Sequence, residues 1–213
     1  NIGTLNKNTI PSMFLAGKKA NELGHIVLLD PVGAGASRLR TDTANRLMQE
    51  VRFDAVRGNI SEIKTLCTGS GSTKGVDADA VDAVTEANLD DGVQLVKAFA
   101  KQTGRIIAVT GPIDLVSDGE RCWCIGNGRP EMSRITGTGC QLSALMTAFL
   151  VANPDHKLAA AAAAVCMMGL AGEIGWANMQ PGDGNSTYRN RIIDAIFNMT
   201  GDALEEGAKY ELR

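Results

Sequence analysis

The chain has 213 residues, 44% of them hydrophobic, and this length and apolar content predict one domain with a sizeable core. Its formal net charge of −3 provides no basic stripe for a phosphate backbone, which argues against nucleic acid as the main partner. The longest uncharged run, Leu158 to Gly172, is rich in alanine and shorter than the roughly 20 residues that cross a bilayer, so it predicts a buried helix and no membrane association.

Strand and helix patterns alternate along the chain. Short runs rich in β-branched residues predict strands, and longer amphipathic runs predict helices. The predicted strands are Ile26 to Asp30, a strand end at Ala55 to Arg57, Arg105 to Thr110, and a hairpin of Ile113 to Ser117 and Arg121 to Ile125 that turns at Asp118-Gly119. The predicted helices are Thr41 to Val51, Asp90 to Thr103, Gln141 to Asn153, Leu158 to Ala177 and Ser186 to Gly201. After Thr138 we expect helices alone, so the sequence predicts an α/β fold with a helical C-terminal layer in a single domain, residues 1–213.

The cysteines indicate a reducing compartment. Their number is odd and their spacing matches neither a disulfide scaffold nor a metal finger: Cys67, Cys122, Cys124, Cys140 and Cys166. We therefore expect reduced thiols and a cytoplasmic protein. The chain opens at Asn1 instead of methionine, so we also expect this sequence to lack an upstream segment.

The strongest candidate site is Thr136-Gly-Thr-Gly-Cys140, directly before the helix that begins at Gln141. Glycines let the backbone approach a ligand closely, and the unpaired amides at a helix start hold negative charge. We expect this motif to surround a phosphoryl group, although a simple glycine-rich turn and helix cap explains the glycines about as well. Cys140 ends the motif, and a thiol at a helix start can orient or deprotonate a substrate hydroxyl. A small buried residue is the alternative for a lone cysteine.

Two acidic motifs follow predicted strands. Asp30-Pro-Val-Gly-Ala-Gly35 lies where open α/β sheets bind ligands, so Asp30 is a candidate holder of a magnesium-bound water. A turn leading into a helix, with Asp30 as its cap, is the alternative. Arg57-Gly-Asn-Ile-Ser-Glu62 places Asn59 and Glu62 on one face of a helix start. This pair predicts either a ligand-binding face or a capping box.

Two shorter motifs carry less weight. Thr110-Gly-Pro ends another strand, where its hydroxyl and amides can touch a nucleotide or simply form a strand-terminating turn. The stretch from Gly69 to Gly75 superficially resembles a phosphate loop, but Lys74 precedes Gly75 instead of the Ser or Thr that a Walker motif requires. We interpret that stretch as a surface loop.

The chain resembles hydroxyethylthiazole kinases, whose motifs occur here in the same order: Asp30-Pro-Val-Gly-Ala-Gly, Arg57-Gly-Asn-Ile-Ser-Glu, Val109-Thr-Gly-Pro and Thr136-Gly-Thr-Gly-Cys. The resemblance implies a ribokinase-like, three-layer α/β/α fold with a central, mostly parallel sheet. It implies a phosphotransferase that uses ATP and Mg²⁺ to phosphorylate the alcohol of 4-methyl-5-(2-hydroxyethyl)thiazole in thiamine biosynthesis and salvage. It also implies a homotrimer with sites between subunits, and a segment before Asn1 that helps to bind the thiazole.

The resemblance gives the site residues their expected roles. Asp30 and Glu62 match the acidic positions around magnesium, and Arg57 and Thr110 match contacts with ATP.

The glycine-rich motif completes this set. Gly137 matches a substrate contact, and we expect Thr138 and Gly139 to bind ATP at the helix start. Cys140 matches the residue that faces the acceptor hydroxyl, a position where most ribokinase-like relatives carry Asp as the general base. Cys140 is thus either the base or a residue that only shapes a site in which anion stabilisation and positioning suffice.

Three other functions fit parts of the pattern. A hydroxymethylpyrimidine or pyridoxal kinase would use the same phosphate machinery on another acceptor, but Asp would be expected in place of Cys140. A related lyase that repairs hydrated nicotinamide cofactors would split ATP independently of thiazole. A nucleotide-binding module without catalysis would bind ATP and release no phosphorylated product.

Overall fold

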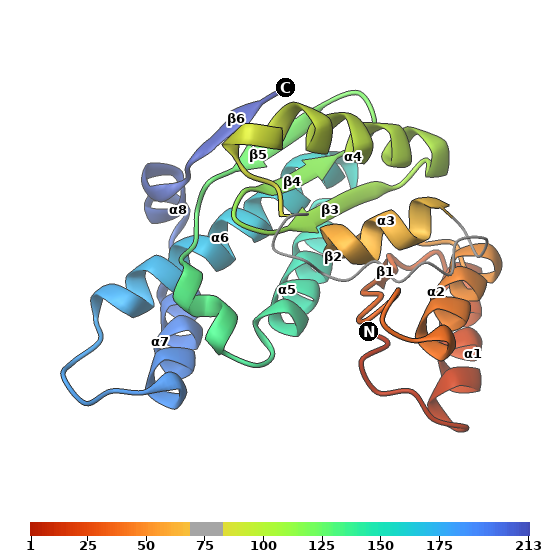
Figure 1. Ribbon diagram of the computed structural model, residues 1–213, viewed down its shortest axis with the longest axis horizontal. Helices are drawn as coiled ribbons and strands as arrows, with labels where there is room; N and C mark the ends of the chain where they lie inside the picture. The colour runs from red at the N-terminus through yellow and green to blue at the C-terminus, as the bar shows by residue number, and fades with distance from the viewer. Residues whose placement is uncertain (69–82) are drawn as a thin grey trace.

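The computed structural model describes residues 1–68 and 83–213, so the predicted loop from Gly69 to Gly75 lies outside the described residues. In these two ranges the chain forms a six-stranded sheet with helices on both faces (Figure 1). The strands are β1 (Leu28–Leu29), β2 (Ala55–Asn59), β3 (Ile106–Thr110), β4 (Asp114–Ser117), β5 (Cys122–Ile125) and β6 (Tyr210–Leu212). The sequence-based prediction of an α/β fold is confirmed.

The strands lie in the sheet in chain order. Strands β1, β2 and β3 are parallel, and β3 to β6 continue the sheet with three antiparallel pairs. The described sheet is therefore mixed, where we expected it to be mostly parallel. Its antiparallel half follows from the predicted hairpin, because the turn after Ser117 folds β5 directly back onto β4, and Gly119 adopts the positive φ of 98° that the turn requires.

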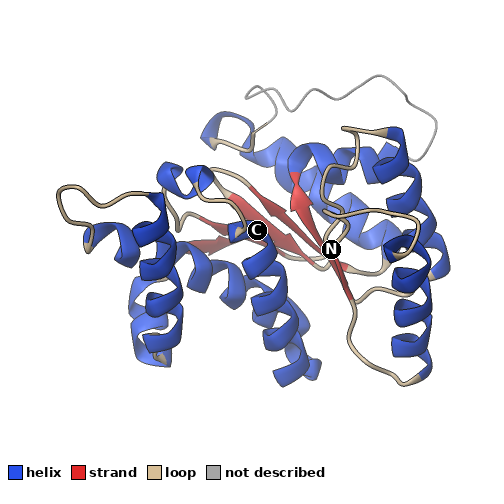
Figure 2. Ribbon diagram, turned by 90° about the horizontal axis from the view of Figure 1, so that it is seen from below, coloured by secondary structure: helices blue, strands red, loops and turns tan. Residues whose placement is uncertain are grey.

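The α-helices form two layers, which Figure 2 shows on either side of the sheet. One layer contains α1 (Thr9–Glu22), α2 (Arg38–Glu50), α3 (Ile60–Thr68) and α4 (Leu89–Thr103). The other contains α5 (Thr138–Ala152), α6 (Lys157–Ala177), α7 (Asn185–Asn198) and α8 (Gly201–Gly207). Short 3₁₀ turns at Glu86–Asn88, Pro130–Arg134 and Pro154–His156 precede α4, α5 and α6.

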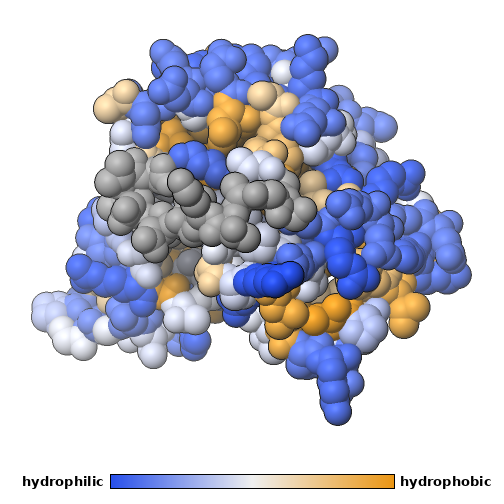
Figure 3. Space-filling model, turned by 45° about the vertical axis from the view of Figure 1, so that its right-hand side comes forward, coloured by the Kyte–Doolittle hydropathy of each residue, from blue (hydrophilic) through white to orange (hydrophobic). Residues whose placement is uncertain are grey.

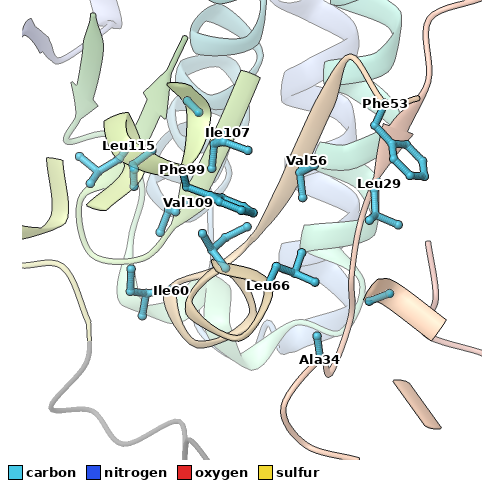
Figure 4. Close-up of a cluster of buried hydrophobic side chains, with 14 of the residues drawn as sticks. Leu29, Ala34, Phe53, Val56, Ile60, Leu66, Phe99, Ile107, Val109 and Leu115 are labelled. Atoms are coloured by element: carbon cyan, nitrogen blue, oxygen red, sulfur yellow. The ribbon is translucent and has the colours of Figure 1, made fainter. Parts of the chain in front are cut away.

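Alternation along the strands produces two cores. Successive side chains of a strand point to opposite faces, so Val56 and Ile107 pack toward α3 and α4 while Ala55 and Ala108 pack toward α5 and α6. Figure 4 shows the first core, where Phe99 of α4 lies against side chains of the sheet. The second core is rich in alanine, which lets α6 approach the sheet closely. Two packed faces hold the carboxyl ends of β1 to β3 in fixed positions.

Helix α6 is longer than the uncharged run that suggested it. With its preceding turn it spans Pro154–Ala177, and by length and composition this segment of the described chain could cross a membrane. In the fold, however, 72% of its most apolar window is buried, and it packs against α5, α7 and the sheet. This environment is that of a core helix.

On the face shown in Figure 3, hydrophilic side chains cover most of the surface and hydrophobic side chains occupy smaller areas between them.

Three elements differ from the sequence-based prediction. Helices α1 and α8 were not predicted; the only buried side chain of α1 is Phe14 and α8 has none, so neither shows a strong apolar pattern. Our expectation that strands stop after Thr138 was wrong, because β6 pairs antiparallel with β5 through Trp123 and Leu212. All three residues of β6 are exposed, which removes the alternating burial that makes a strand visible in a sequence.

Candidate active site

The carboxyl ends of three neighbouring parallel strands meet the start of α5. Asp30 directly follows β1, Arg57 lies in β2 and Thr110 ends β3. Their side chains form one connected cluster, which also includes the first turn of α5 around Gly139 and Cys140. The structure thus brings together residues that are up to 110 positions apart in the sequence.

Asp30 is the most buried member of this cluster, with 1% of its surface exposed. Its Oδ2 atom accepts hydrogen bonds from Asn1 Nδ2 at 2.7 Å and from Ser143 Oγ at 2.8 Å. Its Oδ1 atom lies 3.5 Å from Arg57 Nη1 and has no hydrogen-bond partner in the described chain. The alternative role of Asp30 as a helix cap is wrong, because α2 is capped by the Ser37 side chain.

Arg57 joins the cluster to the neighbouring strand. Its Nη2 atom donates a hydrogen bond of 2.9 Å to Thr110 Oγ1, while Nη1 faces Asp30. The side chain is 11% exposed, and its guanidinium lies against Gly139, where a Cβ would come within 2.8 Å of Nη1. A planar cation with five donors is therefore held beside the start of α5, a geometry that suits phosphate oxygens.

The start of α5 leaves backbone amides unpaired. Gly137 is its N-cap with φ of 98°, and no side chain caps the helix. The first bond of the helix runs from Gln141 N to Gly137 O, so the amides of Thr138, Gly139 and Cys140 precede the intrahelical pattern. The helix-cap interpretation of this motif is confirmed, and it is compatible with anion binding because the free amides and the helix dipole both favour negative charge.

Cys140 is exposed, so the alternative of a small buried residue is wrong. Its sulfur accepts a hydrogen bond of 3.2 Å from Asn1 Nδ2. The remaining cysteines are buried or half-buried, and desolvation raises the pKa of Cys67 and Cys166 to about 11 and that of Cys122 to about 12. Among the cysteines of the described residues, Cys140 is thus the exposed one.

The Glu62 carboxylate lies beside this cluster and accepts hydrogen bonds from the loop after β1 and from the end of β2. Its Oε2 accepts from the Asn59 amide and Asn59 Oδ1 accepts from the Glu62 amide, both at 2.8 Å, so the predicted capping box is confirmed. Its Oε1 accepts from the Gly33 amide at 2.8 Å, which fixes the loop after Asp30. Burial raises the pKa of Glu62, and its hydrogen bonds to Gly33 and Asn59 and the charge of Arg57 oppose this rise.

Sequence reasoning missed three polar residues of this region. Asn1 and Ser143 are the hydrogen-bond partners of Asp30 described above, and neither belongs to a motif that signals such a role. Asp114, at the start of β4, accepts a hydrogen bond of 2.8 Å from the Gly111 amide and thereby shapes the loop after Thr110. Burial raises the pKa of Asp114 to about 7, against the opposing effects of this hydrogen bond and of Arg57. The spacing of three residues between Gly111 and Asp114, which is typical of a side chain that accepts from a nearby backbone amide in a turn, could have predicted this contact.

A separate apolar groove of about 300 Å³ lies between α6, α8 and the edge of the sheet. Its lining includes Trp123, Cys166, Leu204 and Tyr210 and none of the predicted site residues. The predicted site residues therefore lie in the polar cluster and not in this groove.

Comparison with known proteins identifies relatives over the whole chain. Residues 1–202 match the model of the hydroxyethylthiazole kinase family. The chain is 54% identical to the hydroxyethylthiazole kinase of Clostridium acetobutylicum, over 99% of this chain and 77% of that protein. It is 39% identical to the hydroxyethylthiazole kinase of Methanoculleus marisnigri, over 100% of this chain and 72% of that protein.

Solved structures show the same relationship. The hydroxyethylthiazole kinase of Pyrococcus horikoshii superposes with a TM-score of 0.84 at 30% identity, covering 100% of this chain and 75% of that one. The pyridoxal kinase of Staphylococcus aureus superposes with a TM-score of 0.59 at 18% identity, covering 99% and 70%, and shows a shared fold alone.

Proposed function

The chain belongs to the hydroxyethylthiazole kinase family, and from this premise we propose that it transfers the terminal phosphoryl group of ATP to the hydroxyl of 4-methyl-5-(2-hydroxyethyl)thiazole. The product is the thiazole phosphate used in thiamine biosynthesis and salvage. One observation carries the proposal: Arg57 is held by Thr110 and Asp30 against the free amides of α5, which forms a cationic, amide-rich site at the carboxyl ends of the strands. Such a site is suited to a transferring phosphoryl group.

The nucleotide is proposed to lie along the ends of β2 and β3. Arg57 and Thr110 bind its phosphates from the sheet, and the amides of Thr138 and Gly139 bind them from the start of α5. The guanidinium is preorganised, because its bond to Thr110 and its pairing with Asp30 are made within the chain itself. Preorganised donors stabilise the charge that develops on the moving group without reorganising during the reaction.

The acceptor is proposed to lie beside Gly137 and Cys140. The hydroxyl oxygen forms a bond to the γ-phosphorus as the bond to the bridging oxygen breaks, and ADP leaves with that electron pair. The thiolate form of Cys140 takes the hydroxyl proton and becomes the thiol. Its exposure and its place in the first turn of α5 allow direct contact with a substrate at this point.

The residues present fit a magnesium ion. Mg²⁺ binds hard oxygen ligands, commonly one or two carboxylates together with waters and substrate phosphates. Asp30 Oδ1 is buried with no hydrogen-bond partner, and Glu62 is the second carboxylate near it, so we propose that Asp30 and Glu62 hold the ion directly or through its waters. When bound, the ion would neutralise phosphate charge, and the chain itself orients both carboxylates through Asn1, Ser143 and the Gly33 amide.

We further propose a cytoplasmic homotrimer with sites between subunits. The five free cysteines support a reducing compartment, and the family resemblance supports the trimer. Size-exclusion chromatography with light scattering measures the mass of the assembly in solution. A monomer would contradict this part of the proposal.

The deciding experiment supplies the purified protein with ATP, Mg²⁺ and hydroxyethylthiazole and detects the product by mass. Pyridoxal and hydroxymethylpyrimidine, supplied separately, test the other acceptors. Phosphorylated thiazole as the main product is the expected result. Transfer only to another acceptor, or ATP binding with no transfer at all, would refute the proposed function.

A further inference from the structure

The side-chain amide of Asn1 has three partners. Its Oδ1 atom accepts a hydrogen bond of 2.8 Å from the Gly3 amide, which fixes the orientation of the group. The Nδ2 atom then donates in two directions, to Asp30 Oδ2 at 2.7 Å and to Cys140 Sγ at 3.2 Å. Next to it, the Ile2 amide donates to the backbone oxygen of Asp30 at 3.1 Å. Asn1 therefore touches both residues that the proposed reaction places closest to the metal and to the acceptor.

We propose that Asn1 is a positioning residue for phosphoryl transfer, whose single amide nitrogen sets the separation between the carboxylate of Asp30 and the sulfur of Cys140. This inference rests on the proposed function and deepens it. Among the described residues, no other residue forms hydrogen bonds to both of these side chains.

The local chemistry explains why such a residue is needed. Asp30 is buried and held by Ser143 and Arg57, so its position is fixed from several sides. Cys140 is exposed, and the bond from Asn1 is the contact that restrains its sulfur.

Two substitutions separate positioning from folding. Asn1→Ala removes all three hydrogen bonds, including the turn closed by Gly3. Asn1→Asp keeps an oxygen for the Gly3 amide, replaces the donor that faces Asp30 and Cys140 with an acceptor, and adds a carboxylate beside that of Asp30. If Asn1→Ala proves poorly folded, Asn1→Asp still decides the question, provided its unfolding transition is close to that of the wild type.

Asn6 provides a matched control. Its Oδ1 atom accepts from the Asn8 and Thr9 amides, both at 2.9 Å, so it closes the same kind of turn without touching the site. Asn6→Ala should leave the kinetics and the reactivity of Cys140 unchanged.

Two measurements on the full-length protein test the proposal. In steady-state kinetics, both Asn1 variants should lower kcat roughly 10- to 100-fold while the KM for ATP changes by less than about threefold. In alkylation by iodoacetamide without substrates, the rate at Cys140, located by peptide mass, should change by at least about threefold, because its sulfur loses the hydrogen bond from Asn1.

Unchanged kcat, or an unchanged alkylation rate, in Asn1→Asp would overturn the positioning role. The alkylation measurement needs neither ATP nor thiazole. A wild-type protein that phosphorylates no thiazole therefore refutes the proposed function by itself, and is distinguished from a failure at Asn1.

Discussion

Gly139 lies directly against the guanidinium of Arg57, and a Cβ at this position would come 2.8 Å from Nη1 and 2.9 Å from Nη2. The absence of a side chain at Gly139 is what allows an arginine from β2 to reach the first turn of α5 and still donate to Thr110. The glycine is thus required by the close approach of a side chain, and its neighbour Gly137 by a positive φ.

Gly139→Ala should separate stability from nucleotide binding. Alanine is favoured over glycine inside a helix by up to about 1 kcal/mol, which offsets part of the cost of moving Arg57 away from Asp30, so the free energy of unfolding should stay close to that of the wild type. The added methyl group displaces Arg57 from Thr110, so we expect the KM for ATP to rise roughly tenfold or more. Urea unfolding and steady-state kinetics measure the two effects. Gly201→Ala, at the start of α8 with no atom near its Cβ position, is the matched control and should leave the KM unchanged.

Cys140→Ala tests the base. Because the side chain is exposed, the variant should fold with wild-type stability. Loss of general base catalysis lowers kcat by about 10²- to 10⁴-fold, with ATP binding preserved. Single-turnover measurements at saturating thiazole give the rate. If turnover stays at the wild-type value, Cys140 only shapes the site, and anion stabilisation and positioning account for the catalysis.

Glu62→Gln tests the magnesium site. The amide offers one oxygen where the carboxylate offers two, so one of the Gly33 and Asn59 amides loses its acceptor, which costs about 1–2 kcal/mol of stability. A higher magnesium concentration should be needed for half-maximal rate, because a charged ligand is lost.

Glu173→Gln is the control for this variant. Glu173 likewise accepts a hydrogen bond from a backbone amide, that of Gly128 at 2.9 Å, but it belongs to α6 and contacts none of the predicted site residues. Its magnesium titration should match the wild type. If Glu62→Gln and Glu173→Gln titrate alike, Glu62 serves only as a capping residue.

Asp114 gives the protein a pH-dependent stability. Its pKa rises from 3.8 in the unfolded chain to about 7 in the fold, so the folded state binds the proton more tightly. The stability that protonated Asp114 contributes to the fold is complete at pH values below its unfolded pKa of 3.8. It is lost as the pH rises through the folded pKa of about 7. Asp114→Asn is neutral throughout and keeps an oxygen for the Gly111 amide. The free energy of unfolding of Asp114→Asn minus that of the wild type should therefore increase by about 2 kcal/mol from pH 5 to pH 8. This value is smaller than the full pKa shift would give, because Asp114 is partly in contact with solvent. Urea titrations at the two pH values measure this change, and a parallel response of both proteins would exclude Asp114 as its source.

The sequence predicted those parts of the fold and site that depend on local pattern. Alternating strand and helix signals predicted the α/β class, and the rule that ligands bind at strand carboxyl ends made the motifs that begin at Asp30 and Thr110 candidate ligand sites, whereas the role of Arg57 came from the family resemblance. The contact of Glu62 with Asn59 could also be predicted from local pattern, because the two residues of the capping box are three positions apart.

The remaining features depend on long-range contacts. Asn1 and Ser143 act on Asp30 from 29 and 113 positions away, and no local motif encodes either contact. Strand β6 is stabilised by pairing with β5, and its exposed side chains show no core-facing period. Such features follow from tertiary packing, which single-sequence patterns do not contain.

The hydrogen bonds around Asp30 also determine when the site forms during folding. Each of them closes a long loop of chain, and the contact between Asn1 and Cys140 closes one of 139 residues. Closing long loops costs chain entropy early, so contacts between distant residues slow folding and are completed late. Refolding chains should therefore regain the helical signal of α4 and α6 while Cys140 is still unrestrained, and enzymatic competence should return as the last step of the folding reaction.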